Sequence, residues 1–255
     1  MTSLTDAQRA TLESEGFLAL ERFVGDDEIA RLRTIYDRLF SSETGRGEGK
    51  RVDLVAADGA RAATILPLLA EPSRFAPELK DGAFLRNARE AARSVFGAAL
   101  REDFFGEHMI FKPAGAGSET PWHQDMAYHD PALIERSINF WMPLDDADGE
   151  NGCMHYVPGS HRYDVLPHHS IGDDPRVHGL EVDDAAQYHA RSVAVPCRAG
   201  GCVLHLPTTL HYAGPNPTSR QRRAYTLIMH AAPIPREAPI DNYWLRDKRT
   251  SYQRG

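Results

Sequence analysis

Beyond Gly97 the chain consists of short apolar segments separated by Pro, Gly and Asp, and this pattern constrains the fold more than any other feature. Many short strands divided by turn residues are typical of a β-sandwich or a β-barrel. Together with helical patterns in the first hundred residues, it predicts a mainly β jelly roll with flanking helices. The expected strands lie near residues 104–112, 121–125, 137–143, 153–157, 191–195, 202–206 and 223–230.

The residues before Gly97 have the periodicity of helices. Thr5 and Gln8 match a capping box, which predicts a helix that ends at about Glu15. After Gly25, apolar residues recur at steps of three and four, so a second helix should bury one stripe against a sheet. This stripe consists of Ile29, Leu32, Ile35, Tyr36 and Leu39.

We expect the whole chain to form one domain with three parts. A short strand at 17–20 and a third helix at 81–96 complete a helical N-terminal part, residues 1–100. A jelly-roll core of about 101–235 follows. Residues 236–255 form a charged extension that either packs across the barrel or contacts a partner subunit.

Two internal connections are longer than turns require. The stretch 42–61 is rich in Gly, Ser, Arg and Asp and reads as a loop. Residues 159–190 also lack a clear pattern, and loops of this length are often lids or binding loops. The alternative is a polar surface excursion. Residues 159–190 contain five histidines, namely His161, His168, His169, His178 and His189.

Composition argues against several classes of partner. The formal charge is −7 at pH 7 and the pI is near 5.9, whereas nucleic acids and anionic membranes favour basic surfaces. We expect neither a membrane span nor a secretory signal, because no long apolar run or basic leader is present. Cys153, Cys197 and Cys202 lack CxxC spacing and read as free thiols of a cytoplasmic protein, with zinc binding as the alternative. The oligomeric state stays open.

His123 and Asp125 are the strongest candidates for chemistry. They form the only His-x-Asp or His-x-Glu pair in a chain with 12 histidines. On an extended strand, residues two apart point to the same face, so the imidazole and the carboxylate lie side by side. Such a pair is two thirds of the 2-His-1-carboxylate triad, which holds non-haem Fe(II) and leaves three coordination positions open. The alternative is a surface turn with a solvated His and Asp.

The segment from His211 to Arg222 offers the remaining parts. His211 is our candidate for the third ligand, on a different strand that barrel closure would bring to His123. Arg222 follows 11 residues later, enough for a turn and the start of a neighbouring antiparallel strand, so it could reach the barrel interior. A buried arginine without a protein acid needs a ligand anion, and its planar donors fit a carboxylate. Arg223 should point to the opposite face.

One cosubstrate fits these groups. 2-Oxoglutarate can chelate Fe(II) through its 1-carboxylate and 2-keto oxygen while its 5-carboxylate reaches Arg222. That arrangement fills two of the three open metal positions and leaves one for O₂.

A set of motifs extends this pattern over most of the chain. A helix-Gly-Phe-strand opening precedes Phe111-Lys112-Pro113, Trp122-His123-Gln124-Asp125, Asn139-Phe140-Trp141-Met142-Pro143-Leu144, Asn151-Gly152-Cys153-Met154, Pro158-Gly159-Ser160-His161-Arg162 and His211…Asn216…Arg222-Arg223. In this order, the motifs make the chain resemble the phytanoyl-CoA dioxygenase (PhyH) family of Fe(II)/2-oxoglutarate-dependent oxygenases. The ordered set is more specific than any single motif.

The resemblance implies a double-stranded β-helix, or cupin-like, fold. It implies that the iron ligands are His123, Asp125 and His211 and that Arg222 binds 2-oxoglutarate. By position it also implies that Trp141 and His108 line the 2-oxoglutarate pocket. For these two, the alternatives are a core aromatic and a satisfied core histidine.

Two positions bear on details of this resemblance. Ala213 stands where the family often carries a Ser or Thr hydroxyl that assists the cosubstrate, so one hydrogen bond is missing but no metal ligand. Asp125 is a carboxylate rather than the Ala or Gly of halogenating relatives, so chloride ligation is not expected.

We therefore expect an Fe(II)- and 2-oxoglutarate-dependent dioxygenase that hydroxylates a small-molecule metabolite or natural-product intermediate and releases succinate and CO₂. Desaturation, epimerisation or cyclisation with the same cofactors is one alternative, and a non-catalytic jelly-roll binding module is another. Without a strongly basic patch, a free metabolite is favoured over an acyl-CoA. The candidate substrate contacts are Tyr128, His129, His205 and Tyr225.

Overall fold

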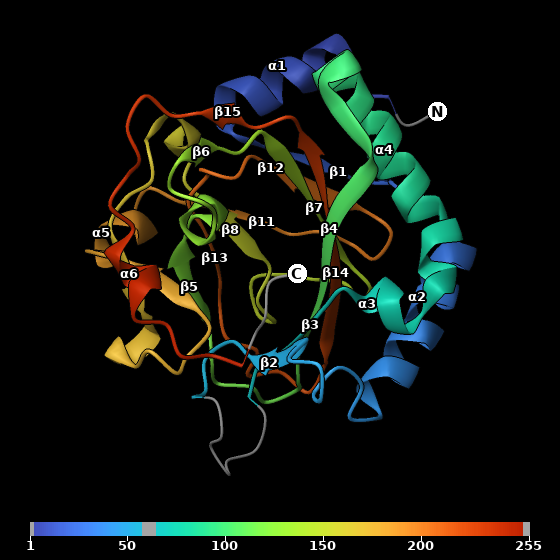
Figure 1. The fold of residues 1–255 in the computed structure, drawn as a ribbon. Coiled ribbons are helices and arrows are strands. Elements are labelled where there is room, and N and C mark those ends of the chain that lie inside the picture. The colour runs from blue at the N-terminus through green and yellow to red at the C-terminus, as the bar shows by residue number, and fades with distance from the viewer. Residues whose placement is uncertain (1–2, 58–64, 252–255) are drawn as a thin grey trace.

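The computed structural model describes residues 3–57 and 65–251, which form two facing β-sheets with helices on the outer side of one sheet (Figure 1). The larger sheet has the order β1 (Phe17–Leu20), β12 (Cys202–His205), β7 (Ser137–Pro143), β14 (Arg222–Ala231), β4 (Leu100–Lys112), β3 (Pro67–Ala70) and β2 (Arg51–Asp53). The smaller sheet has the order β11 (Val193–Val195), β8 (Met154–Tyr156), β13 (His211–Ala213) and β5 (Thr120–His123). Neighbouring strands are antiparallel. The predicted jelly roll with flanking helices is confirmed.

The other elements lie in the connections. The helices are α1 (Asp6–Glu15), α2 (Asp26–Phe40), α3 (Pro72–Phe75), α4 (Ala83–Phe96), α5 (Ala186–His189) and α6 (Tyr243–Arg246). Two small hairpin sheets pair β9 (His168–Ser170) with β10 (Leu180–Val182) and β6 (Leu133–Ile134) with β15 (Ile234–Pro235). The single-turn 3₁₀ helices are η1 (Pro77–Asp81), η2 (Gly97–Ala99), η3 (Asp125–Tyr128), η4 (Ser160–Arg162) and η5 (Ile171–Asp173).

The long helices cover the outer face of the larger sheet. All five residues of the stripe predicted for α2 are buried, in a cluster with Phe140, Leu227 and Met229 from the sheet. Helix α4 lies beside β14 and β4 (Figure 1). Helix α1 begins with the predicted capping box, in which Thr5 and Gln8 each bond the backbone N–H of the other. These helices shield one face and leave the other face of the sheet for the interior.

Side-chain alternation along β14 separates these two faces. Ala224 lies in the cluster between the two sheets, whereas Tyr225 and Leu227 lie in the cluster under the helices. Arg222 shares the inner face of Ala224, because residues two apart on a strand point to the same side. Lys112 of β4 is the register partner of Arg222. The inner face therefore carries two basic residues at one end of β14.

Three predictions about strands need correction. Strand β5 ends at His123, so Asp125 begins η3 instead of continuing a strand. Strands β13 and β14 belong to different sheets, so Arg222 does not follow His211 on a neighbouring strand. The predicted loop 42–61 contains β2, and its residues 58–61 lie outside the described residues. Strand β3 was missed because a run of only four residues carries little periodic signal.

The two long segments of the C-terminal half pack against each other. The connection 159–190 is not featureless, because it holds the β9–β10 hairpin and α5. The C-terminal extension, expected to pack across the barrel or to contact a partner subunit, lies against η3 and the segment before β10. Trp244 Nε1 donates to the Ala127 carbonyl at 2.9 Å, and Lys248 Nζ donates to the carbonyls of Val177 and Gly179. No helix in the described part of the chain is long and apolar enough to span a membrane.

Candidate metal centre

His123, His211 and Asp125 converge between the two sheets. His211 of β13 is the register partner of His123 of β5, and their ring centroids lie 4.1 Å apart. Gln124 has extended backbone angles, so Asp125 turns to the same side as His123. Asp125 Oδ1 lies 3.8 Å from His123 Nε2 and 3.7 Å from His211 Nε2. Among the described residues, this is the one group of three ligand-type side chains close enough to share a metal ion.

Backbone carbonyls fix the orientation of both imidazoles. His123 Nδ1 lies 2.7 Å from the Pro121 carbonyl, and His211 Nδ1 lies 2.9 Å from the Thr209 carbonyl. A carbonyl oxygen only accepts, so each Nδ1 carries the proton and donates. Each Nε2 then presents a lone pair toward Asp125, which is the tautomer that a metal-binding histidine needs.

Burial and neighbouring charges set the protonation of the group. Burial lowers the pKa of His211 well below its ordinary value, and the adjacent His123 lowers it further. Burial also lowers the pKa of His123. Burial alone would raise the pKa of Asp125, but His211 and His205 outweigh it and hold that pKa well below the usual range. The site therefore offers two neutral imidazoles and one carboxylate, which are the protonation states that metal ligands require.

Two further side chains hold Asp125: Asn139, which was missed as a site residue, and His205, which was predicted in another role. Asn139 Nδ2 donates to Asp125 Oδ2 at 2.6 Å, and His205 Nε2 lies 3.0 Å from the same oxygen. His205 was predicted to contact substrate at the opening, but it is buried beneath Asp125. The alternation of β7, in which Asn139 and Trp141 share a face, was the available signal for Asn139.

Two basic side chains, Arg222 and Lys112, meet on the inner face at the far end of β14. Arg222 is 2% exposed, and its Nε has no hydrogen-bond partner among the described residues. Lys112 Nζ donates to the carbonyl oxygens of Ala213, at 3.1 Å, and Gly214. Burial lowers the pKa of Arg222 to about 10, and burial together with Arg222 lowers that of Lys112 to about 6. Arg222 is therefore charged at pH 7 and, in the part of the chain described, pairs with no carboxylate, so the position favours a bound anion.

Trp141 and His108, the other two residues predicted to line the pocket, also have their side chains on the inner face of the larger sheet. Trp141 is buried on the inner face, with its ring centroid 5.5 Å from the Arg222 guanidinium carbon. His108 is the register partner of Thr226, which also pairs with Trp141, so His108 shares that face. Burial lowers the pKa of His108 to about 4, so the side chain is neutral at pH 7. Along β14, their common partner Thr226 lies between Arg222 and Ile228, and Ile228 is the partner of Asn139, which donates to Asp125.

The predicted substrate contacts have different outcomes. Tyr128 lies beside the candidate ligands, with its ring 6.3 Å from that of His123. His129 follows directly at the end of η3. The prediction for Tyr225 is wrong, because its side chain points to the helices and its hydroxyl donates to Glu107.

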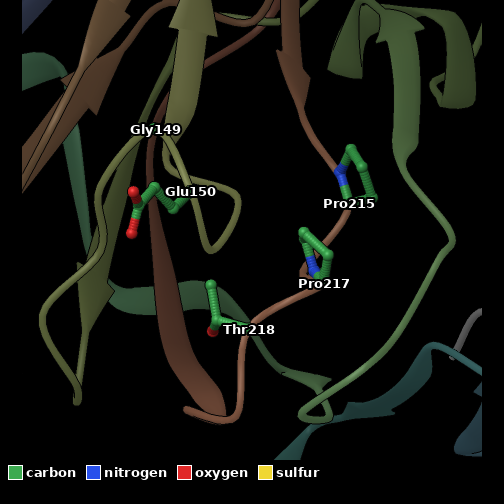
Figure 2. A pocket seen from close by; sticks show the side chains of 5 residues that line it. All are labelled: Gly149, Glu150, Pro215, Pro217 and Thr218. Carbon is green, nitrogen blue, oxygen red and sulfur yellow. The ribbon is translucent and has the colours of Figure 1, made fainter.

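A separate hollow lies at the turns that precede β8 and β14. Figure 2 shows Gly149, Glu150, Pro215, Pro217 and Thr218 around it. None of these residues belongs to the candidate metal centre. The three cysteines are free and buried, and no group of described residues joins a cysteine to a metal-binding cluster, so the zinc alternative gains no support.

Comparison with known proteins agrees with this geometry. The sequence profile of the phytanoyl-CoA dioxygenase (PhyH) family matches residues 12–224. A curated relative, a phytanoyl-CoA dioxygenase of Arabidopsis thaliana, is 25% identical over 88% of each chain. The crystal structure of EvdO2 from Micromonospora carbonacea var. aurantiaca is similar over 95% of this chain and 97% of that one, with 37% identity and a TM-score of 0.82. EvdO2 has also been solved in complex with 2-oxoglutarate, with 38% identity, the same coverage and a TM-score of 0.80. The chain therefore belongs to the phytanoyl-CoA dioxygenase (PhyH) family and is an iron- and 2-oxoglutarate-dependent dioxygenase.

Proposed function

We propose that His123, Asp125 and His211 bind Fe(II), and that Arg222 and Lys112 bind the 5-carboxylate of 2-oxoglutarate. The observation that carries this proposal is the buried Arg222 guanidinium, which has no carboxylate partner among the described residues and pairs in register with Lys112, on the same inner face as the residues around Asp125. A dianionic cosubstrate supplies the missing counter-charge there. When bound, iron and 2-oxoglutarate supply the oxidation, with one atom of O₂ entering succinate and the other the substrate.

The chain's own residues orient and enclose this chemistry. The Pro121 and Thr209 carbonyls keep both Nε2 atoms free for the metal. Trp141 and His108 lie on the inner face beside Arg222 and would border the bound cosubstrate and exclude water from it. Ala213 offers no hydroxyl, and Lys112, which bonds the Ala213 carbonyl, provides the second polar contact in its place.

We propose that the substrate is a small molecule with an unactivated C–H bond, such as a natural-product intermediate, and that the outcome is hydroxylation. Tyr128 would contact it, because its ring lies 6.3 Å from that of His123, and the next residue, His129, is the second candidate. The buried free thiols fit a protein that works in a reducing cytoplasm.

Anaerobic titration with Fe(II) and 2-oxoglutarate tests the metal centre. The intact protein should develop a metal-to-ligand charge-transfer band, and Asp125→Ala should not. Asp130→Asn is the matched control, because this exposed carboxylate lies five residues further on and should leave the band unchanged. A correctly folded protein without the band contradicts the proposal. A screen for substrate-dependent succinate formation, followed by mass analysis of the product, then tests hydroxylation against loss of two hydrogens.

A further inference from the structure

The two oxygens of Asp125 have different surroundings. Oδ1 faces the Nε2 atoms of His123 and His211, which belong to the smaller sheet. Oδ2 accepts from Asn139 and His205, which belong to the larger sheet. The carboxylate therefore bridges the two sheets with one oxygen turned to each.

The donors to Oδ2 are held rigidly. Asn139 of β7 and His205 of β12 are register partners on adjacent strands, so their side chains leave the same face side by side. Both are almost fully buried. The 2.6 Å contact from Asn139 is short for a neutral donor, as expected for a bond to an ionised carboxylate.

A third residue holds the ring of His205 in place. An ionised carboxylate only accepts, so His205 Nε2 donates to Oδ2. The Tyr156 hydroxyl lies 3.2 Å from Nδ1 of the same ring, within hydrogen-bond distance. The Tyr156 ring stacks on Phe17 at 4.7 Å, which fixes its position. Tyr156 and Phe17 thus hold the His205 ring so that its Nε2 meets Oδ2 of Asp125.

This arrangement has a consequence for metal coordination. A carboxylate can bind a metal through one oxygen or through both. With one oxygen from Asp125, a six-coordinate ion keeps three open positions, two for 2-oxoglutarate and one for O₂. With both oxygens, only two positions remain, and 2-oxoglutarate fills them.

We propose that Asn139 and His205 are positioning residues that restrict Asp125 to one metal-bound oxygen and so keep a coordination position open for O₂. This inference rests on the proposed function, because it concerns the iron site assigned there. A purely structural role, in which the two donors only satisfy a buried carboxylate, predicts a change in stability without a change in coordination.

Nitric oxide binding to the anaerobic Fe(II) protein tests the proposal, because nitric oxide occupies an open coordination position and gives an electron paramagnetic resonance signal. The variants are Asn139→Ser, His205→Phe and the double variant, with His205→Gln as the conservative form that keeps an N–H donor. Ser137→Ala is the matched control, since Ser137 is buried on the same face of β7 and has no hydrogen bond to Asp125. Fe(II) is supplied above the dissociation constant measured for each variant.

We expect Asn139→Ser and His205→Phe each to raise the dissociation constant of Fe(II) about 10-fold, and the double variant to raise it about 100-fold. Without 2-oxoglutarate, the double variant should still bind nitric oxide. With 2-oxoglutarate, its signal should be lost, while the intact protein, Ser137→Ala and His205→Gln keep theirs. If the double variant does not fold, a smaller 2-oxoglutarate-loaded signal in Asn139→Ser supports the proposal.

Equal nitric oxide signals in the 2-oxoglutarate-loaded double variant and intact protein would overturn the proposal, as would an unchanged Asn139→Ser signal when only that variant folds. The failure of the proposed function has a different signature, because the intact protein itself would then give no charge-transfer band with Fe(II) and 2-oxoglutarate.

Discussion

Arg222 and Arg223 are consecutive residues of β14, yet their guanidinium groups lie in opposite environments. Arg222 is buried between the sheets without an ion pair among the described residues. Arg223 points to the helices, donates to both oxygens of Asp145 at 2.6 and 2.9 Å, and pairs with Asp37 of α2 at 2.8 Å. The predicted opposite orientation of Arg223 is confirmed. Strand alternation thus separates a cation available to a ligand from one that holds a helix to the sheet.

Arg222→Met should weaken 2-oxoglutarate binding about 100-fold, because truncating one partner of a buried charge pair costs several kcal/mol. Fe(II) affinity should stay nearly intact. Without ligand, the variant should be at least as stable as the intact protein, since an uncompensated buried charge is removed. Titration of the charge-transfer band and urea unfolding of the metal-free protein measure the two effects.

Arg223→Met is the matched control and should behave in the opposite way. It leaves Asp145 without its bidentate partner, so the free energy of unfolding should fall by about 2 kcal/mol. The affinity for 2-oxoglutarate should not change. If Arg223→Met weakens 2-oxoglutarate binding as much as Arg222→Met does, the two faces of β14 are not functionally separate.

Lys112 should take up a proton when 2-oxoglutarate binds. Its pKa of about 6 means that the amine is mostly neutral at pH 8. A bound carboxylate favours the charged form and raises this pKa, so up to one proton should enter from the buffer. Calorimetric titrations in two buffers of different ionisation enthalpy measure that number. Lys112→Met should lose the uptake and bind more weakly; an unchanged uptake would place the titrating group elsewhere.

Local sequence patterns predicted the helices and strands in which apolar side chains recur at a regular spacing. The buried stripe of α2, the capping box of α1 and the bounds of β7 all match the structure. The meeting of His123 and His211 was also expected from the pattern of residue types, and the structure brings both to Asp125. In each case a short window of sequence, or a motif with known chemistry, held the information.

Features that depend on register between strands could not be predicted in this way. Asn139 and His205 are 66 residues apart, and only the pairing of β7 with β12 places them on one oxygen. The partnership of Lys112 with Arg222 likewise follows from the pairing of β4 with β14. Tyr225 is different, because alternation from Arg222 already assigned it to the outer face.

His168 should make the metal-free protein sensitive to acid. Burial lowers its pKa to about 4 and outweighs the hydrogen bond from Nδ1 to the Leu166 carbonyl, which raises it. Nε2 accepts from the Gln124 N–H. The unfolded chain titrates near 6.5, so between pH 6.5 and 4 it binds more protons than the folded chain, and stability falls as the pH falls. The contribution of His168 is about 3 kcal/mol over this window.

Urea unfolding at a series of pH values measures this loss. His168→Gln keeps an amide that can bond both partners but cannot titrate, so its unfolding free energy should fall less steeply, by up to about 1.4 kcal/mol per pH unit. Parallel curves for the intact protein and the variant would show that His168 is not the group responsible.

Trp244 should link the C-terminal extension to metal binding. Its indole packs with Ala127 and Leu180 and donates to the Ala127 carbonyl, and Ala127 lies in the same short helix as Asp125. Trp244→Ala should lower the free energy of unfolding by about 3 kcal/mol. Fe(II) affinity should fall as well, because η3 loses the contact that holds Asp125 in place. Trp244→Phe keeps most of the packing, so its free energy of unfolding and its Fe(II) affinity should lie between those of Trp244→Ala and the intact protein.

Tyr243→Ala is the control for Trp244, because this neighbouring side chain is 42% exposed. Its effect on unfolding should be within about 0.5 kcal/mol, with unchanged Fe(II) affinity. Fluorescence-detected unfolding and Fe(II) titration separate the two quantities. A Trp244→Ala protein that is destabilised but binds Fe(II) as tightly as the intact chain would show that η3 keeps its shape without the extension. The extension would then stabilise the fold without organising the site.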